Sequence, residues 1–177
     1  VDRLTRVFRY WATPEPTEWG RGLDLPMAAS MFMYSRNPSA PPQAAYLEGD
    51  REGLLDAYRR GWIDTLHSLG DFGPGGFTRE LARRAFEMLR ADDVRIQVWT
   101  DHGGPENTHN FLRPDSRGDL PDCSEYCADL ALEYGIRFCW TSELTHLVGQ
   151  ARPARAIEYY RTYRNRSVIR KALAWTA

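Results

Sequence analysis

The fold of this chain is decided by one stretch, residues 62–71, which reads WIDTLHSLGD. Its apolar and β-branched residues predict a buried strand, and the glycines from Gly70 onward predict that this strand ends abruptly. We expect a helix to begin at Thr78, whose hydroxyl can cap it. In an α/β fold this order places His67 and Asp71 at the carboxyl end of a strand, where such folds bind their ligands. Any chemistry is therefore expected there.

Composition limits the classes of protein and partner. At 177 residues, 42% hydrophobic and 12% aromatic, the chain can bury one substantial core, and we expect a single domain over residues 1–177. The 23 basic and 24 acidic residues give a formal charge of -1, so there is no bulk attraction to nucleic acid or anionic membranes. No apolar run approaches the about 18 residues that a membrane span needs. The sequence does not begin like a secretory leader, which favours a cytoplasmic location.

The rest of the chain alternates between strand and helix patterns. Strands are expected at 27–34, 62–69, 94–99 and 136–140, and helices at 3–11, 51–60, 78–91, 123–134 and about 153–175. Strands separated by helices predict a parallel sheet with right-handed crossovers, which fits a barrel or an open doubly wound sheet. Four strands are too few to close a barrel of about eight, and no strand precedes the first helix. We therefore expect an α/β fold with a parallel-stranded (β/α) barrel that is incomplete or truncated at its N-terminus.

His67 and Asp71 form the first candidate site. They are four positions apart, and the glycine between them lets the backbone turn so that both side chains converge. A neutral imidazole with a carboxylate suits zinc or a similar divalent ion, provided that another strand end adds a third ligand and one position stays open for water. The alternative is a histidine that caps a loop or binds a backbone carbonyl.

A second candidate site follows the next strand. The run TDHGG at 100–104 contains Asp101 and His102, with Asn107 and His109 close behind. Its glycines allow a ligand to approach backbone amides. The alternative is a tight polar turn whose Asp and Asn side chains bond their own backbone. Because two neighbouring strands end in His with Asp, we expect functional groups at their common edge.

Aromatic residues of the strands form a third group. Phe32, Tyr34, Trp99 and Trp140 could make a stacking floor for a sugar, although such residues are usually core. Glu143 ends the last strand, where a carboxylate acts either as an acid or base or simply as a solvated end. The sequence contains no Walker loop, no Gly-x-Gly-x-x-Gly after a strand and no Gly-x-Ser-x-Gly elbow. This disfavours NTPase, dinucleotide-binding and α/β-hydrolase functions.

The first site carries a family resemblance. The run HSLGD at 67–71 resembles the metal-binding H-[ST]-x-x-H signature of polysaccharide deacetylases of the NodB-homology, carbohydrate esterase type, with Asp71 in place of the second histidine. The wider pattern, GWIDTLHS at 61–68, WTDHGG at 99–104 and YGIRF at 134–138, resembles deacetylase-like proteins that accompany bacterial surface-polysaccharide genes. The resemblance covers about residues 24–148.

This resemblance implies a (β/α) barrel of the deacetylase type that binds a divalent metal ion, most simply zinc, and removes acetyl groups from carbohydrate. By position, the metal ligands would be Asp2, His67 and Asp71. The catalytic residues would be Asp2, Asp101 and His102, with His102 protonating the leaving group. Ser68, with the glycine-lined turn, would donate to the developing oxyanion. The residues expected to contact substrate are Ser68, Trp99, Asn107 and Trp140.

Two other functions stay open. A carbohydrate-binding or scaffold relative could keep the barrel without catalysis, which Asp71 in place of histidine and the missing first strand would allow. A metal-dependent hydrolase of another bond needs more His and Asp at strand ends than the sequence has. We expect a carbohydrate partner, no nucleic acid and no membrane span, and the sequence leaves the oligomeric state open.

Overall fold

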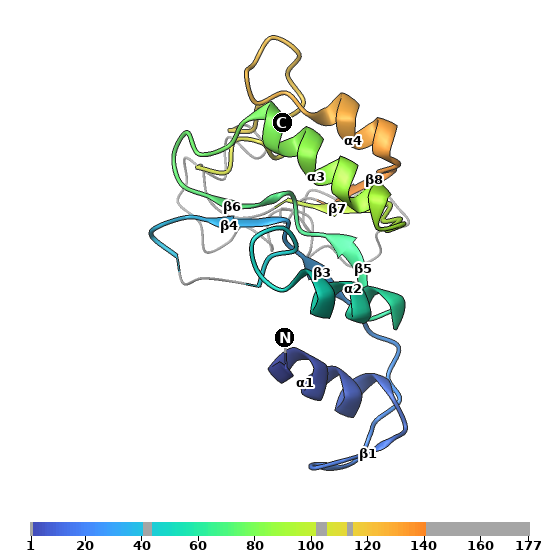
Figure 1. The fold of residues 1–177 in the computed structure, drawn as a ribbon. Coiled ribbons are helices and arrows are strands. Elements are labelled where there is room, and N and C mark those ends of the chain that lie inside the picture. Colours follow the sequence, from blue (N-terminus) through green and yellow to red (C-terminus); the bar gives the residue numbers. More distant parts are fainter. Residues whose placement is uncertain (1, 41–43, 102–105, 113–114, 141–177) are drawn as a thin grey trace, which may run out of the picture. The chain divides into compact units, whose positions relative to one another are not determined.

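The computed structural model of this chain (Figure 1) describes residues 2–40, 44–101, 106–112 and 115–140, the side chains of residues 2–4 excepted. The chain divides into two units, Val1–Trp140 and Thr141–Ala177. The second unit, with the helix predicted at about 153–175 and with Glu143, lies outside the described residues. The fold below is therefore that of the first unit.

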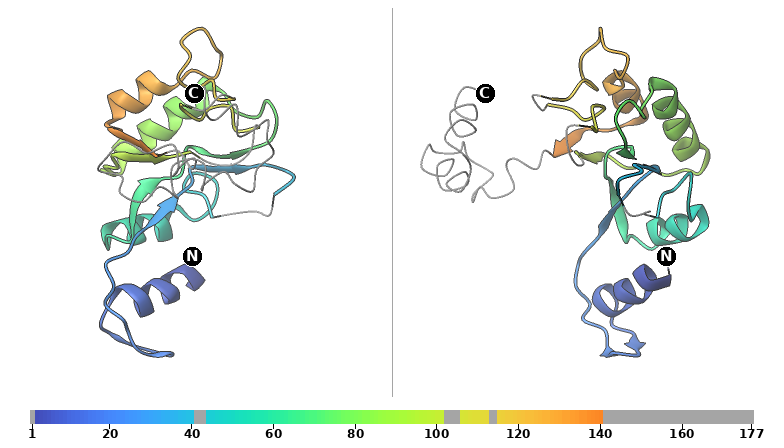
Figure 2. Two further views of the ribbon diagram at one scale, coloured as in Figure 1. Left: turned by 180° about the vertical axis from the view of Figure 1, so that it is seen from behind. Right: turned by 90° about the vertical axis from the view of Figure 1, so that its left-hand side faces the viewer.

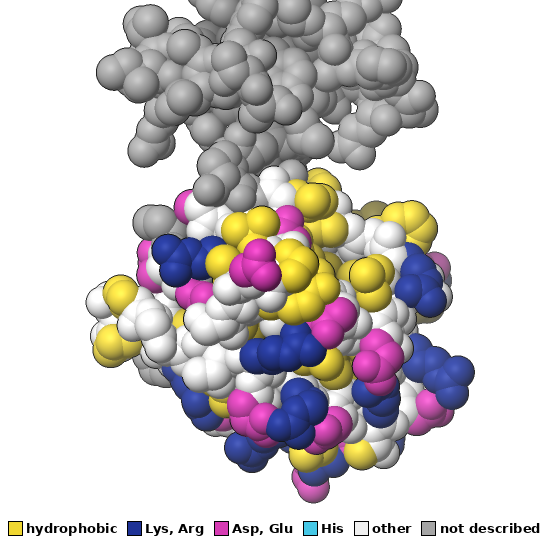
Figure 3. Space-filling model, turned by 90° about the horizontal axis from the view of Figure 1, so that it is seen from above, with side chains coloured by type: hydrophobic (Ala, Val, Ile, Leu, Met, Phe, Trp, Pro, Cys, Tyr) yellow, Lys and Arg dark blue, Asp and Glu magenta, His cyan; other side chains and the backbone are white. Residues whose placement is uncertain are grey.

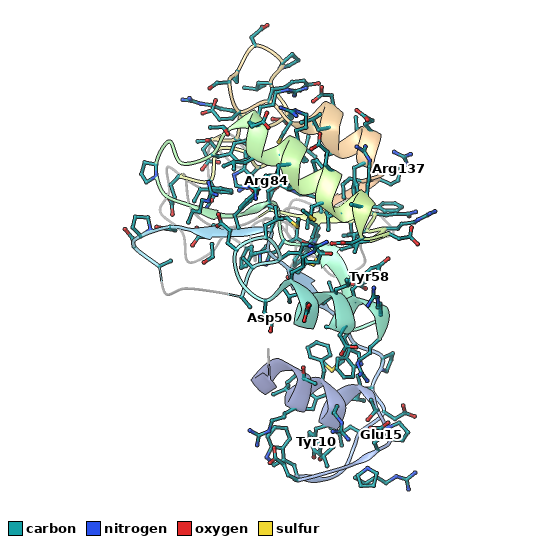
Figure 4. All side chains as sticks on the ribbon, in the orientation of Figure 1. Tyr10, Glu15, Asp50, Tyr58, Arg84 and Arg137 are labelled. Carbon is teal, nitrogen blue, oxygen red and sulfur yellow. The ribbon has the colours of Figure 1, made fainter. Side chains whose placement is uncertain are left out.

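The chain begins with an amphipathic helix, α1 (Asp2–Ala12), which confirms the helix predicted at 3–11. Its Phe8 is buried against Trp62, with ring centroids 5.8 Å apart. A short antiparallel hairpin of β1 (Pro16–Thr17) and β2 (Gly20–Arg21) follows, which the sequence did not predict. Tyr10, labelled in Figure 4, meets Trp19 of this hairpin edge-on at 5.7 Å. The helix and hairpin thus pack on each other.

A parallel sheet forms the centre of the unit. Its strands are β3 (Ala29–Met31), β5 (Ile63–Leu66), β7 (Val98–Thr100) and β8 (Phe138–Trp140), hydrogen-bonded in that order. Helices α2 (Arg51–Arg59), α3 (Arg79–Ala91) and α4 (Ala128–Tyr134) lie in the connections between them. The predicted α/β fold with a parallel sheet is confirmed. The strands follow chain order across the sheet, as barrel strands do, but no barrel closes within the described residues.

Capping residues set the starts of two helices. Asp50, labelled in Figure 4, accepts the N–H of Gly53 at 2.8 Å and begins α2, and Thr78 accepts the N–H of Leu81 at 3.4 Å and begins α3. The helix predicted from Cys123 begins only at Ala128. The preceding residues form short turns instead, in which each N–H bonds a carbonyl three positions back (Cys123 to Leu120, Tyr126 to Cys123).

One face of the sheet packs against helices. Met31, Leu66 and Trp99 are neighbours across the sheet and at most 2% exposed. They share one apolar core with four residues of α3: Ala82, Ala85, Phe86 and Leu89. The right-hand view of Figure 2 shows α2 and α3 on the same side of the strands.

The opposite face is more exposed. Because strand side chains alternate between faces, the neighbours of the buried row lie on the other side of the sheet: Ser30, Thr65, Val98 and Phe138. We call this side the open face. Phe138 is 62% exposed there.

Ion pairs cover the outer surface of the helices. Arg79 pairs with Asp129 at 2.6 Å and Arg90 with Glu133 at 3.2 Å, which joins α3 to α4. Basic and acidic side chains are interspersed over the surface seen in Figure 3, without a large patch of one sign. None of the helices in the described ranges combines the length and the apolarity that crossing a membrane requires.

Candidate functional site

The stretch that carries His67 and Asp71 consists of two short strands joined by a bulge. After β5, strand β6 (Gly70–Phe72) pairs in parallel with β4 (Tyr34–Arg36). Met31 pairs with Leu66, and Tyr34 pairs with Gly70. Two residues, 32–33, lie between the first members of these pairs, whereas three residues, 67–69, lie between their partners. The second segment has one residue more, which is a β-bulge. The strand predicted at 62–69 ends earlier, at Leu66, and the sequence did not predict the second strand that begins at Gly70, which pairs with Tyr34.

Backbone conformation explains the bulge. Ser68 has φ 48° and Gly70 has φ 137°, and both values lie in the region that favours glycine. A Cβ on Gly70 would lie 2.1 Å from the carbonyl oxygen of Tyr34. Only glycine lets the two backbones approach this closely, so Gly70 determines where β6 resumes.

His67 lies on the open face, and the side chain of Asp71 faces away from the helices from the separate two-stranded sheet of β4 and β6. The imidazole Nδ1 of His67 lies 3.1 Å from Ser30 Oγ, and its ring stacks on Phe32 at 4.9 Å. Asp71 is followed in β6 by Phe72, whose ring lies 5.7 Å from that of Tyr34. The Tyr34 hydroxyl donates to the Leu81 carbonyl of α3, so Phe72 packs on the helix side. By alternation, Asp71 points to the other side. Both side chains thus face away from the helices, and the convergence of His67 and Asp71 on one point stays a prediction.

Three strand ends meet at the Asp71 carboxylate. Its Oδ1 accepts from Asn37 Nδ2 and from Asn107 Nδ2, each at 3.1 Å. Asn37 directly follows β4, and Asn107 lies in the loop after β7. The carbonyl oxygen of the Asn107 side chain accepts the backbone N–H of Phe72 at 2.9 Å. Asp71 and Asn107 are 5% and 2% exposed, so these bonds lie in the interior.

This arrangement changes the role expected for one residue and adds another. Asn107 was predicted to contact substrate, but both ends of its amide are bonded to β6. Asn37 was not predicted as part of the site at all. Its position directly after a parallel strand was the signal, because the carboxyl ends of parallel strands meet at one edge.

Ser68 points into the protein. It is fully buried, its Oγ lies 3.1 Å from His109 Nε2, and it accepts the N–H of Gly70 at 3.3 Å. His109, also fully buried, stacks on Phe77 at 4.5 Å. The hydroxyl has no exposed surface and bonds within the core, so these contacts give no support to the predicted role of Ser68 as a substrate and oxyanion contact.

Trp99 and Asp101 lie on the helix-covered side. Trp99 has no exposed surface and stacks on Phe111 at 4.4 Å. These contacts are those of a core residue and give no support to the predicted sugar contact. Asp101 Oδ1 accepts from Trp99 Nε1 at 2.9 Å and from the N–H of Phe111 at 3.1 Å. Both hydrogen bonds hold the Asp101 carboxylate beside Trp99. They give no support to the catalytic role that we predicted for Asp101.

Three predicted site residues remain: Trp140, which the structure describes fully, Asp2, of which it describes the backbone, and His102, which lies outside the described residues. Trp140 pairs with Thr100, is 45% exposed and lies on the open face, two positions after Phe138. Asp2 is the first residue of α1. The side chain of Asp2 and all of His102 lie outside the described residues.

The contacts of His67 and Asp71 fit a metal site, although the described residues do not complete one. Ligating imidazoles commonly hydrogen-bond through their second nitrogen, and ligating carboxylates are themselves hydrogen-bonded. Ser30 Oγ lies 3.1 Å from Nδ1 of His67, and the amides of Asn37 and Asn107 bond the Asp71 carboxylate. Within the described part of the chain, no group of three or more His, Cys, Asp or Glu side chains comes together.

Similarity to known proteins adds no further information on the site. No protein-family model, no curated protein and no solved structure matches this chain. The polysaccharide deacetylase resemblance therefore stays a prediction from the sequence.

Proposed function

We propose that this chain is a metal-dependent hydrolase that removes acetyl groups from a carbohydrate, on an incomplete (β/α) barrel of the polysaccharide deacetylase type. One observation supports the proposal above the others. His67 directly follows β5 of the four-stranded sheet and Asp71 lies on β6 of the two-stranded sheet, and both side chains face away from the helices. The carboxyl ends of parallel strands are where such folds bind ligands. Each of the two residues also has the hydrogen-bond partners that metal ligands usually have.

In this proposal His67 Nε2 and the Asp71 carboxylate would hold the ion, and their donor types suit zinc. When bound, zinc polarises a carbonyl group and lowers the pKa of a coordinated water from about 16 to about 7. Ser30 orients the His67 ring, and Asn37 and Asn107 orient the carboxylate. His102 stays our proposed acid for the leaving group.

Metal content and acetate release test this function directly. Protein purified without chelator is analysed for zinc, and acetate release is measured on an N-acetylglucosamine oligomer and an O-acetylated xylan oligomer. We expect stoichiometric zinc in the wild type, and a loss on the order of 100-fold or more in zinc affinity and acetate release for His67→Ala and Asp71→Ala. Asp64→Ala is the matched control, since Asp64 is an exposed carboxylate on β5. Unchanged release in both site variants would rule out this site.

A second candidate is a carbohydrate-binding relative without catalysis. It is favoured by the neutral amides on Asp71, because they bind a carboxylate whether or not a metal ion is present. Calorimetry with the same oligomers in EDTA separates the two functions. Sugar binding that persists without metal, together with no acetate release in zinc, would favour the binding protein.

A further inference from the structure

We propose that the loop after β7 is a clamp on the bulge, and that its residues Asn107 and His109 are positioning residues for Asp71 and His67. The inference rests on the proposed function, since it concerns the same two candidate ligands. Neither Asn107 nor His109 would touch the ion or the substrate. They would act by keeping the side chains of His67 and Asp71, at the two ends of the bulge segment, turned away from the helices.

Asn107 fixes the far end of the bulge segment. Its amide donates to Asp71 Oδ1 at 3.1 Å and accepts from the N–H of Phe72, the next residue, at 2.9 Å. A side-chain amide bonded at both ends has one orientation, so it defines the direction of the carboxylate relative to the β6 backbone. The exposure of 2% for Asn107 means that water does not substitute easily for either bond.

His109 fixes the near end of the same segment. Its Nε2 lies 3.1 Å from the hydroxyl of Ser68, the residue directly after His67. Ser68 has φ 48°, a backbone conformation that costs about 1 to 2 kcal/mol for a residue other than glycine. The contact with His109 favours this conformation. The ring of His109 is in turn held between Phe77, stacked at 4.5 Å, and Phe72, edge-on at 5.0 Å.

The loop that carries both residues is itself held in place. Gly118 packs so closely that a Cβ on it would lie 2.2 Å from the carbonyl oxygen of His109. The N–H of Gly118 donates to the carbonyls of Thr108 and Asn110, and the Cys127 thiol lies 3.8 Å from the His109 carbonyl oxygen. These contacts give the clamp a fixed backbone from which to act.

The bulge needs such a clamp because strand register sets side-chain direction. A bulge that relaxes into a regular strand shifts the register by one residue, and this shift turns side chains to the opposite face. For residues 67–71 it would direct His67 or Asp71 toward the helices. Contacts at Ser68 and at Asp71 prevent the shift from both ends.

Zinc affinity and cobalt spectra test the clamp. Asn107→Ala and Ser68→Ala each remove one clamp contact, and Ser68→Ala does so with little change in volume and without altering His109. We expect each variant to bind zinc about 10- to 100-fold more weakly in competition with a chromophoric chelator, with a shifted visible absorption band of the Co²⁺ form. The control is Asn110→Ala, a buried residue of the same loop. The melting temperature of each variant is measured as well. For a similar loss of melting temperature, Asn110→Ala should weaken zinc binding by less than about threefold.

The outcomes separate the inference from the function on which it rests. Zinc binding in the wild type with equal affinity and an unchanged cobalt spectrum in Asn107→Ala and Ser68→Ala would overturn the clamp and leave the proposed function intact. An equal loss of affinity in Asn110→Ala would also overturn it, because the effect would then be general destabilisation. A wild type without zinc affinity or acetate release would overturn the proposed function, and the positioning role with it.

Discussion

At the scale of single residues, Asp92 is a carboxylate outside the site that joins two other segments of the chain. It lies at the C-terminal end of α3, is 9% exposed, and accepts from the Tyr46 hydroxyl and from the guanidinium of Arg51, whose Nε lies 2.9 Å from Oδ2. The hydrogen bonds from Arg51, followed by the bond from Tyr46, hold the pKa of Asp92 below its ordinary value, although burial acts in the opposite direction. Asp92 therefore ties α2 and the segment before it to α3.

This pKa predicts an acid-sensitive contribution to stability. A carboxyl whose pKa is lower in the folded state stabilises the fold above its unfolded pKa of 3.8 and loses that contribution as pH falls through the lower folded value. We expect Asp92→Asn to cost about 1 to 3 kcal/mol at pH 6, because the buried Tyr46 hydroxyl and Arg51 lose a charged acceptor. Urea unfolding of wild type and Asp92→Asn at pH 6 and pH 3 measures this difference in the free energy of unfolding.

The comparison between variants isolates Asp92 from other acids. Hydrogen bonds from Arg79 to Asp129 and from Ser124 to Glu125 also lower the pKa values of those carboxyls, so the wild type alone would show a mixed acid response. The difference between wild type and Asp92→Asn should shrink on going from pH 6 to pH 3. A difference that stays constant over this range contradicts the assignment.

At the scale of elements, the bulge between β5 and β6 depends on Gly70. Gly70→Ala combines an unfavourable backbone conformation, at φ 137°, with a Cβ placed 2.1 Å from the Tyr34 carbonyl oxygen. We expect a loss of stability on the order of 3 kcal/mol, at the upper end of what local backbone strain costs. The strand must also shift to relieve the clash, so zinc affinity should fall with stability. Chemical unfolding and zinc titration of the same preparations measure both effects.

Gly75 offers a matched control for this element. It has φ 69°, and a Cβ there would meet no atom within 4 Å. Gly75→Ala therefore tests the conformational cost alone, which we expect to be about 1 to 2 kcal/mol. Equal losses in the two variants would show that the close approach to Tyr34 does not matter.

The elements also show what the sequence can predict. The caps at Asp50 and Thr78 are local signals, because each side chain bonds a backbone N–H three residues later, and the helices they begin were predicted closely. The strand predicted at 94–99 formed only at its end, as β7 (Val98–Thr100). Val94 and Ile96 are buried outside any strand, and hydrophobicity alone does not distinguish a buried strand from buried irregular backbone.

The site was predictable only in part for a related reason. The sequence indicates that His67 and Asp71 lie at one edge, because strand order and alternation are patterns of the chain itself. The partners of Asp71 are 34 and 36 residues away, at Asn37 and Asn107. Which of these polar residues bonds which depends on register between strands, and that register includes a bulge that no local pattern indicates.

At the scale of the whole described unit, the order of the strands decides where a substrate could bind. Consecutive strands are neighbours, and their core residues pack with α3 on one side of the sheet. His67, Phe138 and Trp140 lie on the open face, and Asp71 of β6 also faces away from the helices. Candidate ligands and exposed aromatic rings are therefore on one side, separated by the width of β7. Neighbouring strands are about 4.8 Å apart, so β5 and β8 on either side of β7 are about 10 Å apart, and an extended sugar chain spans that distance.

This geometry predicts a role for Trp140 in binding sugar oligomers. An aromatic ring on which an apolar surface stacks contributes about 0.5 to 1.5 kcal/mol, so Trp140→Ala should weaken binding of an oligomer by about 2- to 12-fold while leaving zinc affinity unchanged. Calorimetric titration with the oligomer measures this without relying on turnover, so it applies to the enzyme and to the binding protein alike. Leu132→Ala is the control, since Leu132 is 59% exposed but belongs to α4. Equal affinity in Trp140→Ala and wild type would place the sugar elsewhere, and an equal loss in Leu132→Ala would locate binding on the helical side.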